Sequence, residues 1–234
     1  MDKRGSHVGM MLSFVVFVTF LVFIYSITQP ALKKEGDKET ILNFLKTELV
    51  KRVSANLTSY SINIEGASGL QGEKNCFIIA NILEFKDENV IVKDEGGSLI
   101  GVTSSADKSE LKIDWNDQSK KFFKIYYSKE NLLKKPASND VCKNIVGEYT
   151  KRGIKTDLYV FEEKMKNILD EDYAKLKNDF GVPENTEFSI EFKSQKGGFQ
   201  DELPSTNVYA EEIPIQYVDE QANINTDKII VRVW

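Results

Sequence analysis

Histidine is almost absent from this chain: His7 is the only one in 234 residues. Histidine is the general base of Ser-His-Asp and Cys-His sites and a ligand in HExxH zinc sites, so these chemistries are excluded after residue 7. The sequence contains no GxSxG motif, no P-loop and no strand-linked GxGxxG motif. The pairs Gly96-Gly97 and Gly197-Gly198 are more simply interpreted as turns. We therefore expect a protein that is not an enzyme and takes no cofactor or metal.

Basic residues are outnumbered by acidic ones. The chain has 36 Asp and Glu against 31 Lys and Arg, for a net charge of −5. This balance argues against nucleic acid as a partner, because phosphate binding needs a basic face. The acidic groups Asp87-Glu88, Asp94-Glu95 and Asp170-Glu171-Asp172 lie in predicted turns or at helix starts. Solvated turn residues are therefore the favoured interpretation, with a carboxylate hydrolase as the alternative.

Cysteine is also scarce, since Cys76 and Cys142 are the only two. Two cysteines make a poor zinc site, because structural zinc usually needs four ligands. In an outward-facing domain they are candidates for a disulfide, which would stabilise the fold by roughly 4 kcal/mol on the chain-entropy model. Two unlinked thiols are the alternative.

One stretch, from Val8 to Ile27, has no charged residue at all. As a helix it would span roughly 30 Å, the thickness of the hydrocarbon core of a bilayer. We predict a single membrane-spanning helix rather than a cleaved signal peptide, since Ser26-Ile27-Thr28 before Gln29-Pro30 is a poor cleavage site. Pro30 is expected to end or kink the helix. The predicted membrane-spanning helix includes the apolar residues Val8, Phe14, Phe17, Phe20, Phe23 and Ile27.

The residues that flank this span suggest its orientation. Lys3 and Arg4 precede it, and a short basic head is normally retained in the cytoplasm. We expect a single-pass protein of the cell membrane with its N-terminus cytoplasmic and its C-terminal domain extracytoplasmic. The lipid bilayer is its first expected partner.

Beyond the span, apolar residues recur every four positions at Ile41, Leu45, Leu49 and Val53. This spacing predicts an amphipathic helix over about 37–56 that lays one face on the outer domain. Asn56-Leu57-Thr58 at its end is an N-glycosylation sequon, although so short a pattern often arises by chance.

Alternating apolar residues then indicate strands. Asn89–Lys93 and Ser98–Thr103 flank Asp94–Gly97 as a first hairpin, and Leu111–Trp115 and Phe122–Tyr127 suggest a second. A short helix is expected near Val141–Tyr149. In the C-terminal part, the pattern of apolar residues predicts a strand at 157–161, a helix at 162–180, and strands at 188–192, 208–218 and 228–234.

The predicted fold class is α+β: a transmembrane helix continued by an amphipathic helix, then a β-rich, sandwich-like extracytoplasmic part and a C-terminal α+β part. The predicted divisions are a cytoplasmic head at 1–7, the transmembrane helix at 8–29 and a helical stalk at 30–58. The β-rich domain follows at 59–135, and the α+β domain at 136–234.

Lys3-Arg4-Gly5, followed by Ser6 and the apolar helix, resembles the class III signal of archaeal type IV pilin-like proteins. The resemblance implies cleavage between Gly5 and Ser6 by a membrane peptidase. It also implies an apolar helix that is held in the membrane or, in true pilins, packed in a filament core, and a β-rich outer part. Phe122–Ser128 and Ile230–Trp234 are similar to uncharacterised single-pass archaeal proteins with such an N-terminus.

These observations predict a non-enzymatic, membrane-anchored, pilin-like surface or assembly component. Its partners would be like pilin helices or another envelope protein. The alternative is a signal-anchored envelope protein whose outer domain binds a partner without polymerising.

Overall fold

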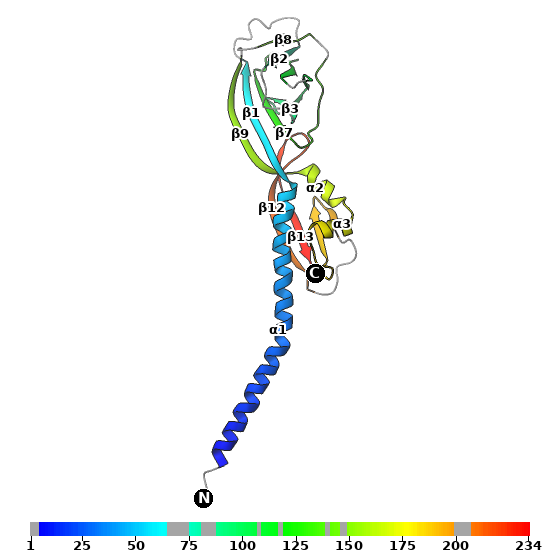
Figure 1. The fold of residues 1–234 in the computed structure, drawn as a ribbon. Coiled ribbons are helices and arrows are strands. Elements are labelled where there is room, and N and C mark those ends of the chain that lie inside the picture. Colours follow the sequence, from blue (N-terminus) through cyan, green and yellow to red (C-terminus); the bar gives the residue numbers. More distant parts are fainter. Residues whose placement is uncertain are drawn as a thin grey trace.

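The computed structural model describes residues 5–64, 75–80, 88–106, 109–116, 119–138, 141–145, 149–198 and 207–234, without the side chains of residues 5–8 and 28–36. It is a mixed α+β structure that consists mostly of β-sheet, with an apolar helix at the N-terminus (Figure 1). The helices are α1 (Gly5–Val53), α2 (Glu162–Leu169) and α3 (Tyr173–Asp179). The strands are β1 (Ser54–Ile64), β2 (Cys76–Ala80), β3 (Asn89–Asp94), β4 (Leu99–Ile100), β5 (Val102–Ser104), β6 (Glu110–Asp114), β7 (Phe122–Ser128), β8 (Lys143–Asn144), β9 (Tyr149–Phe161), β10 (Phe188–Phe192), β11 (Gln195–Gly198), β12 (Tyr209–Val218) and β13 (Ile224–Val233).

Helix α1 is one continuous element of 49 residues. It does not end at Pro30, but in Figure 1 its lower part is inclined to its upper part, as expected of a helix with an interior proline. The predicted amphipathic helix ends at Val53 rather than near residue 56, because Ser54 already pairs as a strand with Val160. The predicted stalk of 30–58 therefore includes the first part of β1.

Strand β1 lies in the middle of a nine-stranded sheet with the order β11-β10-β13-β12-β9-β1-β7-β3-β4. The long strands β1 and β9 run together along the molecule and connect its two lobes (Figure 1). A smaller sheet has the order β5-β6-β2-β8. Since the large sheet passes through both lobes, backbone pairing between β9 and β12 links the distal lobe to the C-terminal strands.

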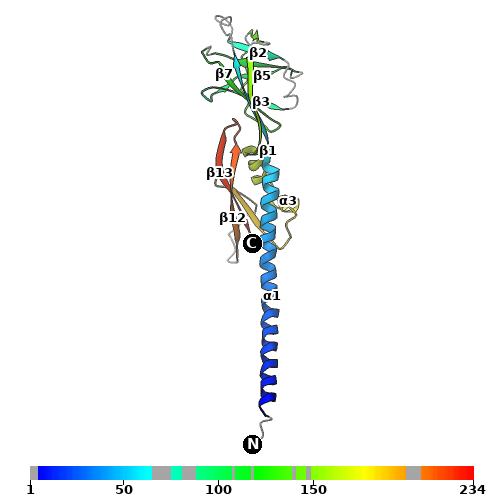
Figure 2. The same ribbon diagram turned by 90° about the vertical axis from the view of Figure 1, so that its left-hand side faces the viewer.

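The distal lobe, farthest from the N-terminus, contains the small sheet and the facing part of the large sheet (Figure 2). Apolar side chains from both sheets meet in one core, here named the distal cluster. Its fully buried members include Ile62 of β1, Phe77 of β2, Val92 of β3, Ile113 of β6 and Ile125 of β7.

The distal lobe confirms one predicted hairpin in part and corrects the other. Strands β3 and β4 pair antiparallel around the turn at Asp94–Gly97, as expected, but the strand predicted over 98–103 is divided at Gly101, and β5 pairs with β6 in the small sheet. Strand β6, however, pairs with β2 and β5, and β7 pairs with β1 and β3. The prediction was wrong because alternation identifies the buried face of each strand without identifying its partner. Both strands face the distal cluster, but from opposite sheets.

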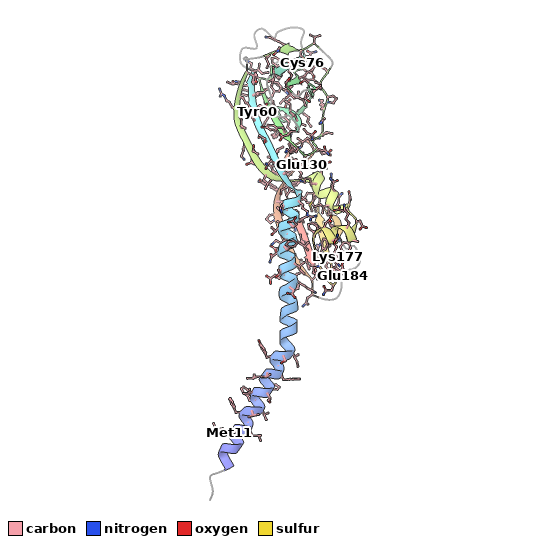
Figure 3. The ribbon with its side chains drawn as sticks, in the orientation of Figure 1. Met11, Tyr60, Cys76, Glu130, Lys177 and Glu184 are labelled. Atoms are coloured by element: carbon pink, nitrogen blue, oxygen red, sulfur yellow. A yellow bond between two sulfur atoms is a disulfide. The ribbon has the colours of Figure 1, made fainter. Side chains whose placement is uncertain are left out.

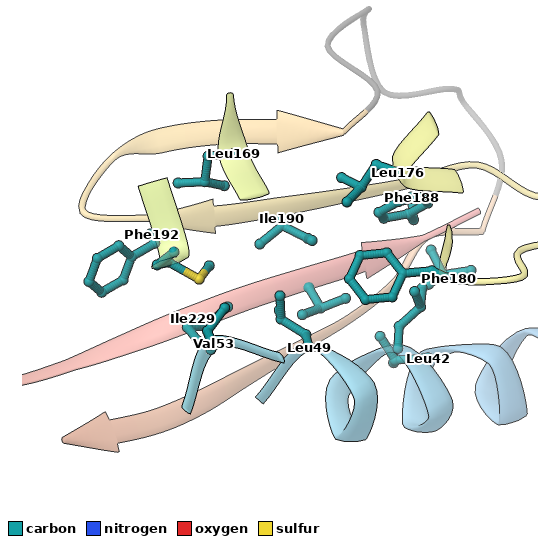
Figure 4. Close-up of a cluster of buried hydrophobic side chains, with 14 of the residues drawn as sticks. Leu42, Leu49, Val53, Leu169, Leu176, Phe180, Phe188, Ile190, Phe192 and Ile229 are labelled. Atoms are coloured by element: carbon teal, nitrogen blue, oxygen red, sulfur yellow. The ribbon is translucent and has the colours of Figure 1, made fainter. Parts of the chain in front are cut away.

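The proximal lobe is built around the upper part of α1 (Figure 4). Leu45, Leu49 and Val53 pack against α2, α3 and strands β10, β12 and β13, and each is at most 1% exposed. The predicted apolar stripe is therefore the face of α1 that enters this core, named the proximal cluster. In Figure 4, Leu42, Leu49 and Val53 lie opposite Phe180, Phe188 and Ile229.

A third group of buried residues joins the two lobes and is named the junction cluster: Leu57, Ile91, Tyr126, Leu132, Phe161, Val218 and Ala222. It lies on the face of β1, β3 and β7 opposite the distal cluster. The turn between β12 and β13, residues 219–223, covers it, and Leu133 N donates to the Glu220 carbonyl at 2.6 Å. The C-terminal hairpin of the proximal lobe thus reaches onto the sheet of the distal lobe.

Several C-terminal predictions need correction. The helix predicted at 162–180 is two helices, because Asp172 accepts a hydrogen bond from Lys175 N and starts α3 afresh. No helix occurs in the described residues 141–145, where β8 forms instead. The strand expected at 157–161 begins already at Tyr149, and Gly197-Gly198, which was expected to form a turn, belongs to β11.

Candidate functional site

The most distinctive surface of the described chain is the lower half of α1, Gly9–Ile27. It is long and apolar enough to cross a membrane, has a mean hydropathy of 2.5, and none of it is buried against the rest of the chain. Figure 3 shows its side chains, such as that of Met11, projecting with no other element around them. The exposed fractions of Phe14, Phe17, Phe20, Phe23 and Ile27 lie between 57% and 67%.

Two of the hydroxyl groups within this half are hydrogen-bonded to the helix itself. Thr19 Oγ1 donates to the carbonyls of Val15 and Val16 at 3.0 and 2.9 Å, and Ser26 Oγ donates to the Val22 carbonyl at 2.8 Å. A hydroxyl bonded to its own helix needs no water. These two side chains are therefore compatible with a hydrocarbon surrounding.

The upper half of α1, Asp37–Val53, is fixed to the proximal lobe by polar contacts as well as by apolar packing. Lys46 forms an ion pair with Glu211 of β12. Arg52 donates to the Asp179 carbonyl at 2.5 Å, and its guanidinium lies 4.5 Å from the centre of the Phe180 ring. Because contacts on two sides hold the helix, its direction is fixed relative to the lobe.

The structure places the remaining sequence-predicted site residues as follows. Gly5, Ser6 and Val8 belong to the first turns of α1, and their side chains lie outside the described residues. Asn56 is exposed on β1, opposite Leu158 of β9, rather than at a helix end. Its carbonyl accepts a hydrogen bond from Ser128 Oγ at 2.8 Å, so the sequon belongs to a paired strand.

Cys76 and Cys142 are joined by a disulfide, with their Cα atoms 4.7 Å apart. The bond links β2 to the segment just before β8, which pairs parallel to β2. Sequence reasoning had left two unlinked thiols open. The bond lies in the distal lobe, at the end of the molecule away from the N-terminus (Figure 3).

A groove of about 520 Å³ lies between the two lobes. Its lining includes Asn131 and Leu133 from the connection after β7 and Glu162 and Lys166 from α2. Glu162 forms ion pairs with both Lys166 and Lys193 at 2.9 Å. Burial raises the pKa of Glu162, but the hydrogen bonds from Lys193 and Lys166 outweigh it and hold that pKa below its usual value.

A second cavity, of about 260 Å³, lies in the distal lobe and is lined by Glu88, Glu110 and Lys134 among others. Glu88 Oε2 is buried and has no hydrogen-bond partner among the described residues. Burial raises the pKa of Glu88, and the charge of Lys129 partly offsets this. Within the described ranges, no three His, Cys, Asp or Glu side chains gather as metal ligands.

Sequence reasoning missed one polar cluster, which lies under the turn between β12 and β13. Lys93 Nζ of β3 donates to Asn223 Oδ1 at 2.6 Å, and Asn223 Nδ2 donates to Asp219 Oδ2 at 2.8 Å. Lys93 is only 5% exposed. No local signal could have found this cluster, because 130 residues separate Lys93 from Asn223.

No family model, no curated protein and no solved structure matches this chain.

Proposed function

We propose that this chain is a non-enzymatic, membrane-anchored protein of pilin-like type, which displays its β-rich lobes outside the cytoplasm as a surface or assembly component. One observation carries the proposal: a single uninterrupted helix has an apolar, uncovered lower half and an upper half that is part of the core of the proximal lobe. Such a helix both anchors the lobes and sets their orientation.

The lipid bilayer is the partner that suits the lower half of α1. Leaving these side chains in water would expose a large apolar surface, whereas a bilayer core matches their length. Lys3 and Arg4 before the helix favour a cytoplasmic N-terminus, so the lobes would lie on the other side. We infer that the distal lobe, where two sheets share one core, is a sandwich-like display module.

Protease treatment of intact cells tests the display. With a tag placed after Trp234, external protease should remove the tag and the lobes, while a cytoplasmic marker protein stays intact. If the tag is protected until the cells are lysed, the proposed orientation is wrong. Recovery of the untreated protein in the soluble fraction would contradict the anchor itself.

A second candidate is a signal-anchored envelope protein that binds a partner without polymerising. It is favoured by the uncovered face of the upper half of α1, where Asn43, Thr47 and Lys51 are exposed and polar beside the exposed Phe44. A face on which polar side chains surround an exposed aromatic ring offers little continuous apolar surface to a like helix. Electron microscopy of sheared surface material separates the candidates: filaments that contain this chain support the pilin-like function, and filaments without it support the second.

The mass of the purified protein tests processing. The pilin-like proposal expects a chain that begins at Ser6, and retention of Met1–Gly5 would contradict the cleavage while leaving the membrane anchor intact.

A further inference from the structure

The polar cluster under the turn between β12 and β13 brings together a lysine, an asparagine and an aspartate. Lys93 Nζ lies 2.6 Å from Asn223 Oδ1, and Asn223 Nδ2 lies 2.8 Å from Asp219 Oδ2. The three residues are named the junction triad. They connect β3 of the distal lobe with the C-terminal hairpin of the proximal lobe, so the triad bridges the two lobes.

Surrounding contacts fix Lys93 and Asp219, whereas Asn223 is an exposed residue of the turn. Lys93 is 5% exposed, and its Nζ lies 5.4 Å from the centre of the Tyr126 ring, which belongs to the junction cluster. Asp219 Oδ1 accepts hydrogen bonds from Gln221 N at 2.9 Å and Asn223 N at 2.8 Å, which closes the turn. The asparagine amide is therefore held against the amine from one side and against the carboxylate from the other.

The geometry brings an amine within reach of an amide carbon. The carbonyl bond of an amide is about 1.23 Å long, so Lys93 Nζ lies at most about 3.8 Å from Asn223 Cγ. Reacting groups held at such distances gain a large advantage over the same groups free in solution. A small rotation of the Asn223 side chain would turn the face of its carbonyl carbon toward the amine.

The state of the lysine also favours attack. Burial lowers the pKa of Lys93 below its ordinary value, Asp219 opposes this shift, and the charge of Lys124 adds to it. A lowered pKa increases the share of neutral amine, which is the nucleophilic form.

We propose that Lys93 and Asn223 form an intramolecular isopeptide bond, with Asp219 as the proton-transfer group. The neutral Nζ attacks Asn223 Cγ, and an Nζ–Cγ bond forms. Asp219 accepts a proton from Nζ and passes one to Nδ2. The Cγ–Nδ2 bond then breaks, and ammonia leaves. One amine and one primary amide become one secondary amide and one ammonia, so the step needs no oxidant, reductant or other reactant.

A second close pair offers an internal comparison. Lys120 Nζ lies 2.5 Å from Asp94 Oδ2 in the distal lobe. Hydrogen bonds from Lys120 and Ser98 outweigh burial and lower the pKa of Asp94, so its side chain is a carboxylate. A carboxylate is a poor target for an amine, and this pair should remain an ion pair. We therefore expect an isopeptide bond where the partner of the lysine is an amide, as in Lys93 and Asn223, and not where the partner is a carboxylate, as in Lys120 and Asp94.

The bond would secure the junction between the lobes. Strand β1 already joins α1 to the distal lobe, and the bond would add a covalent tie from β3 to the hairpin that packs on α1. A display module anchored in this way keeps its two lobes together under load.

Tryptic mapping of the reduced and alkylated full-length protein tests the bond. Trypsin does not cleave after a lysine whose amine is acylated, so the expected product joins Asp87–Lys108 to Gly197–Lys228. Its mass should be the sum of the two peptides less one ammonia. Recovery of Asp87–Lys93 as a free peptide in most of the molecules would overturn the proposal.

Three variants of the triad and one control variant make the test specific, with circular dichroism to check that each folds. Lys93→Arg keeps a cation that can donate to Asn223 but lacks the nucleophilic amine, and Asn223→Ala removes the amide. Both should lose the cross-linked product completely. Asp219→Asn should reduce its yield at least tenfold in freshly folded protein. Lys120→Arg should leave the yield unchanged. A cross-linked product that persists in Lys93→Arg would contradict the assignment.

Discussion

The two halves of α1 share one backbone and differ in everything around them. In the lower half, Phe17 and Phe20 are 58% and 57% exposed, and no other element of the described chain covers them. In the upper half, Leu45 and Leu49 are each 1% exposed and belong to the proximal cluster. The upper half is therefore packed into a core, whereas the lower half has no such covering within the described chain.

The contrast follows from how apolar residues are distributed around the helix. From Gly9 to Ile27 they occupy every side, as expected of a helix surrounded by lipid. From Ile41 to Val53 they form one stripe, and Asn43, Thr47 and Lys51 lie on the other side. One helix can therefore belong to two environments, with Pro30 between them.

The largest expected effect comes from placing charge in the lower half. Under the proposed function, Phe17→Lys with Phe20→Lys should cost roughly 5–7 kcal/mol of membrane insertion, at about 2.5–3.5 kcal/mol per lysine. The double variant should leave the membrane pellet after alkaline carbonate extraction, whereas Phe17→Leu with Phe20→Leu should stay in it.

Phe44→Lys is the matched variant in the upper half. Phe44 is 54% exposed, nearly as much as Phe17, but lies outside the apolar stripe, on the uncovered face of the upper half of α1. Its substitution should leave extraction unchanged. Equal loss from the membrane for Phe44→Lys and the double variant would mean that the two halves are not distinct.

Removal of the disulfide tests whether the stability of the distal lobe is independent of the anchoring of α1. Replacing both Cys76 and Cys142 by Ala should lower the free energy of unfolding by about 4 kcal/mol, because the unfolded chain loses a long covalent loop. Guanidinium unfolding in detergent, followed by tryptophan fluorescence, measures this change. Membrane extraction should be unaffected. A stability equal to that of the native protein would contradict a structural role for the bond.

A cavity in the proximal cluster should have the next largest effect. Leu49→Ala removes a side chain that is 1% exposed, and we expect a loss of about 3 kcal/mol in the free energy of unfolding. Phe20→Ala, in the lower half, should leave that free energy unchanged in detergent. If both substitutions destabilise the lobes equally, the lower half must also contact them.

The smallest expected effect is on the loss of stability at acidic pH. The lowered pKa of Asp94 means that its contribution to stability is complete above its ordinary value of 3.8 and is lost as the pH falls through the folded pKa. Asp94→Asn should therefore reduce the difference in Tm between pH 7 and pH 3. The matched variant Asp227→Asn, at a half-buried position of β13, should leave that difference as it is.

Much of the fold follows from local sequence patterns. The apolar run and the stripe at Ile41, Leu45, Leu49 and Val53 predicted α1 and its buried face, and Asp94–Gly97 predicted the β3–β4 turn. Long-range pairing could not be predicted in this way. Alternation in β6 and β7 suits either sheet, so the two strands were wrongly paired with each other.

The candidate sites also divide into those that local sequence predicts and those that depend on long-range contacts. The apolar surface of α1 is readable from composition. The sequence also made Cys76 and Cys142 candidates for a disulfide, and the structure shows that bond. The junction triad depends on β3 meeting the turn after β12, and nothing in either segment specifies that contact. Likewise, the start of β1 directly after Val53 is decided by pairing with β9, which overrides the helical pattern around Asn56.

The most direct test of the anchor compares two single cysteines in vesicles. Phe17→Cys and Phe44→Cys place thiols at sites of similar exposure, 58% and 54%, in a protein whose own cysteines are joined. With the protein in lipid vesicles and its lobes outward, a water-soluble maleimide should label Phe44→Cys and should not label Phe17→Cys until detergent is added. Equal labelling of both cysteines before detergent would contradict the membrane anchor.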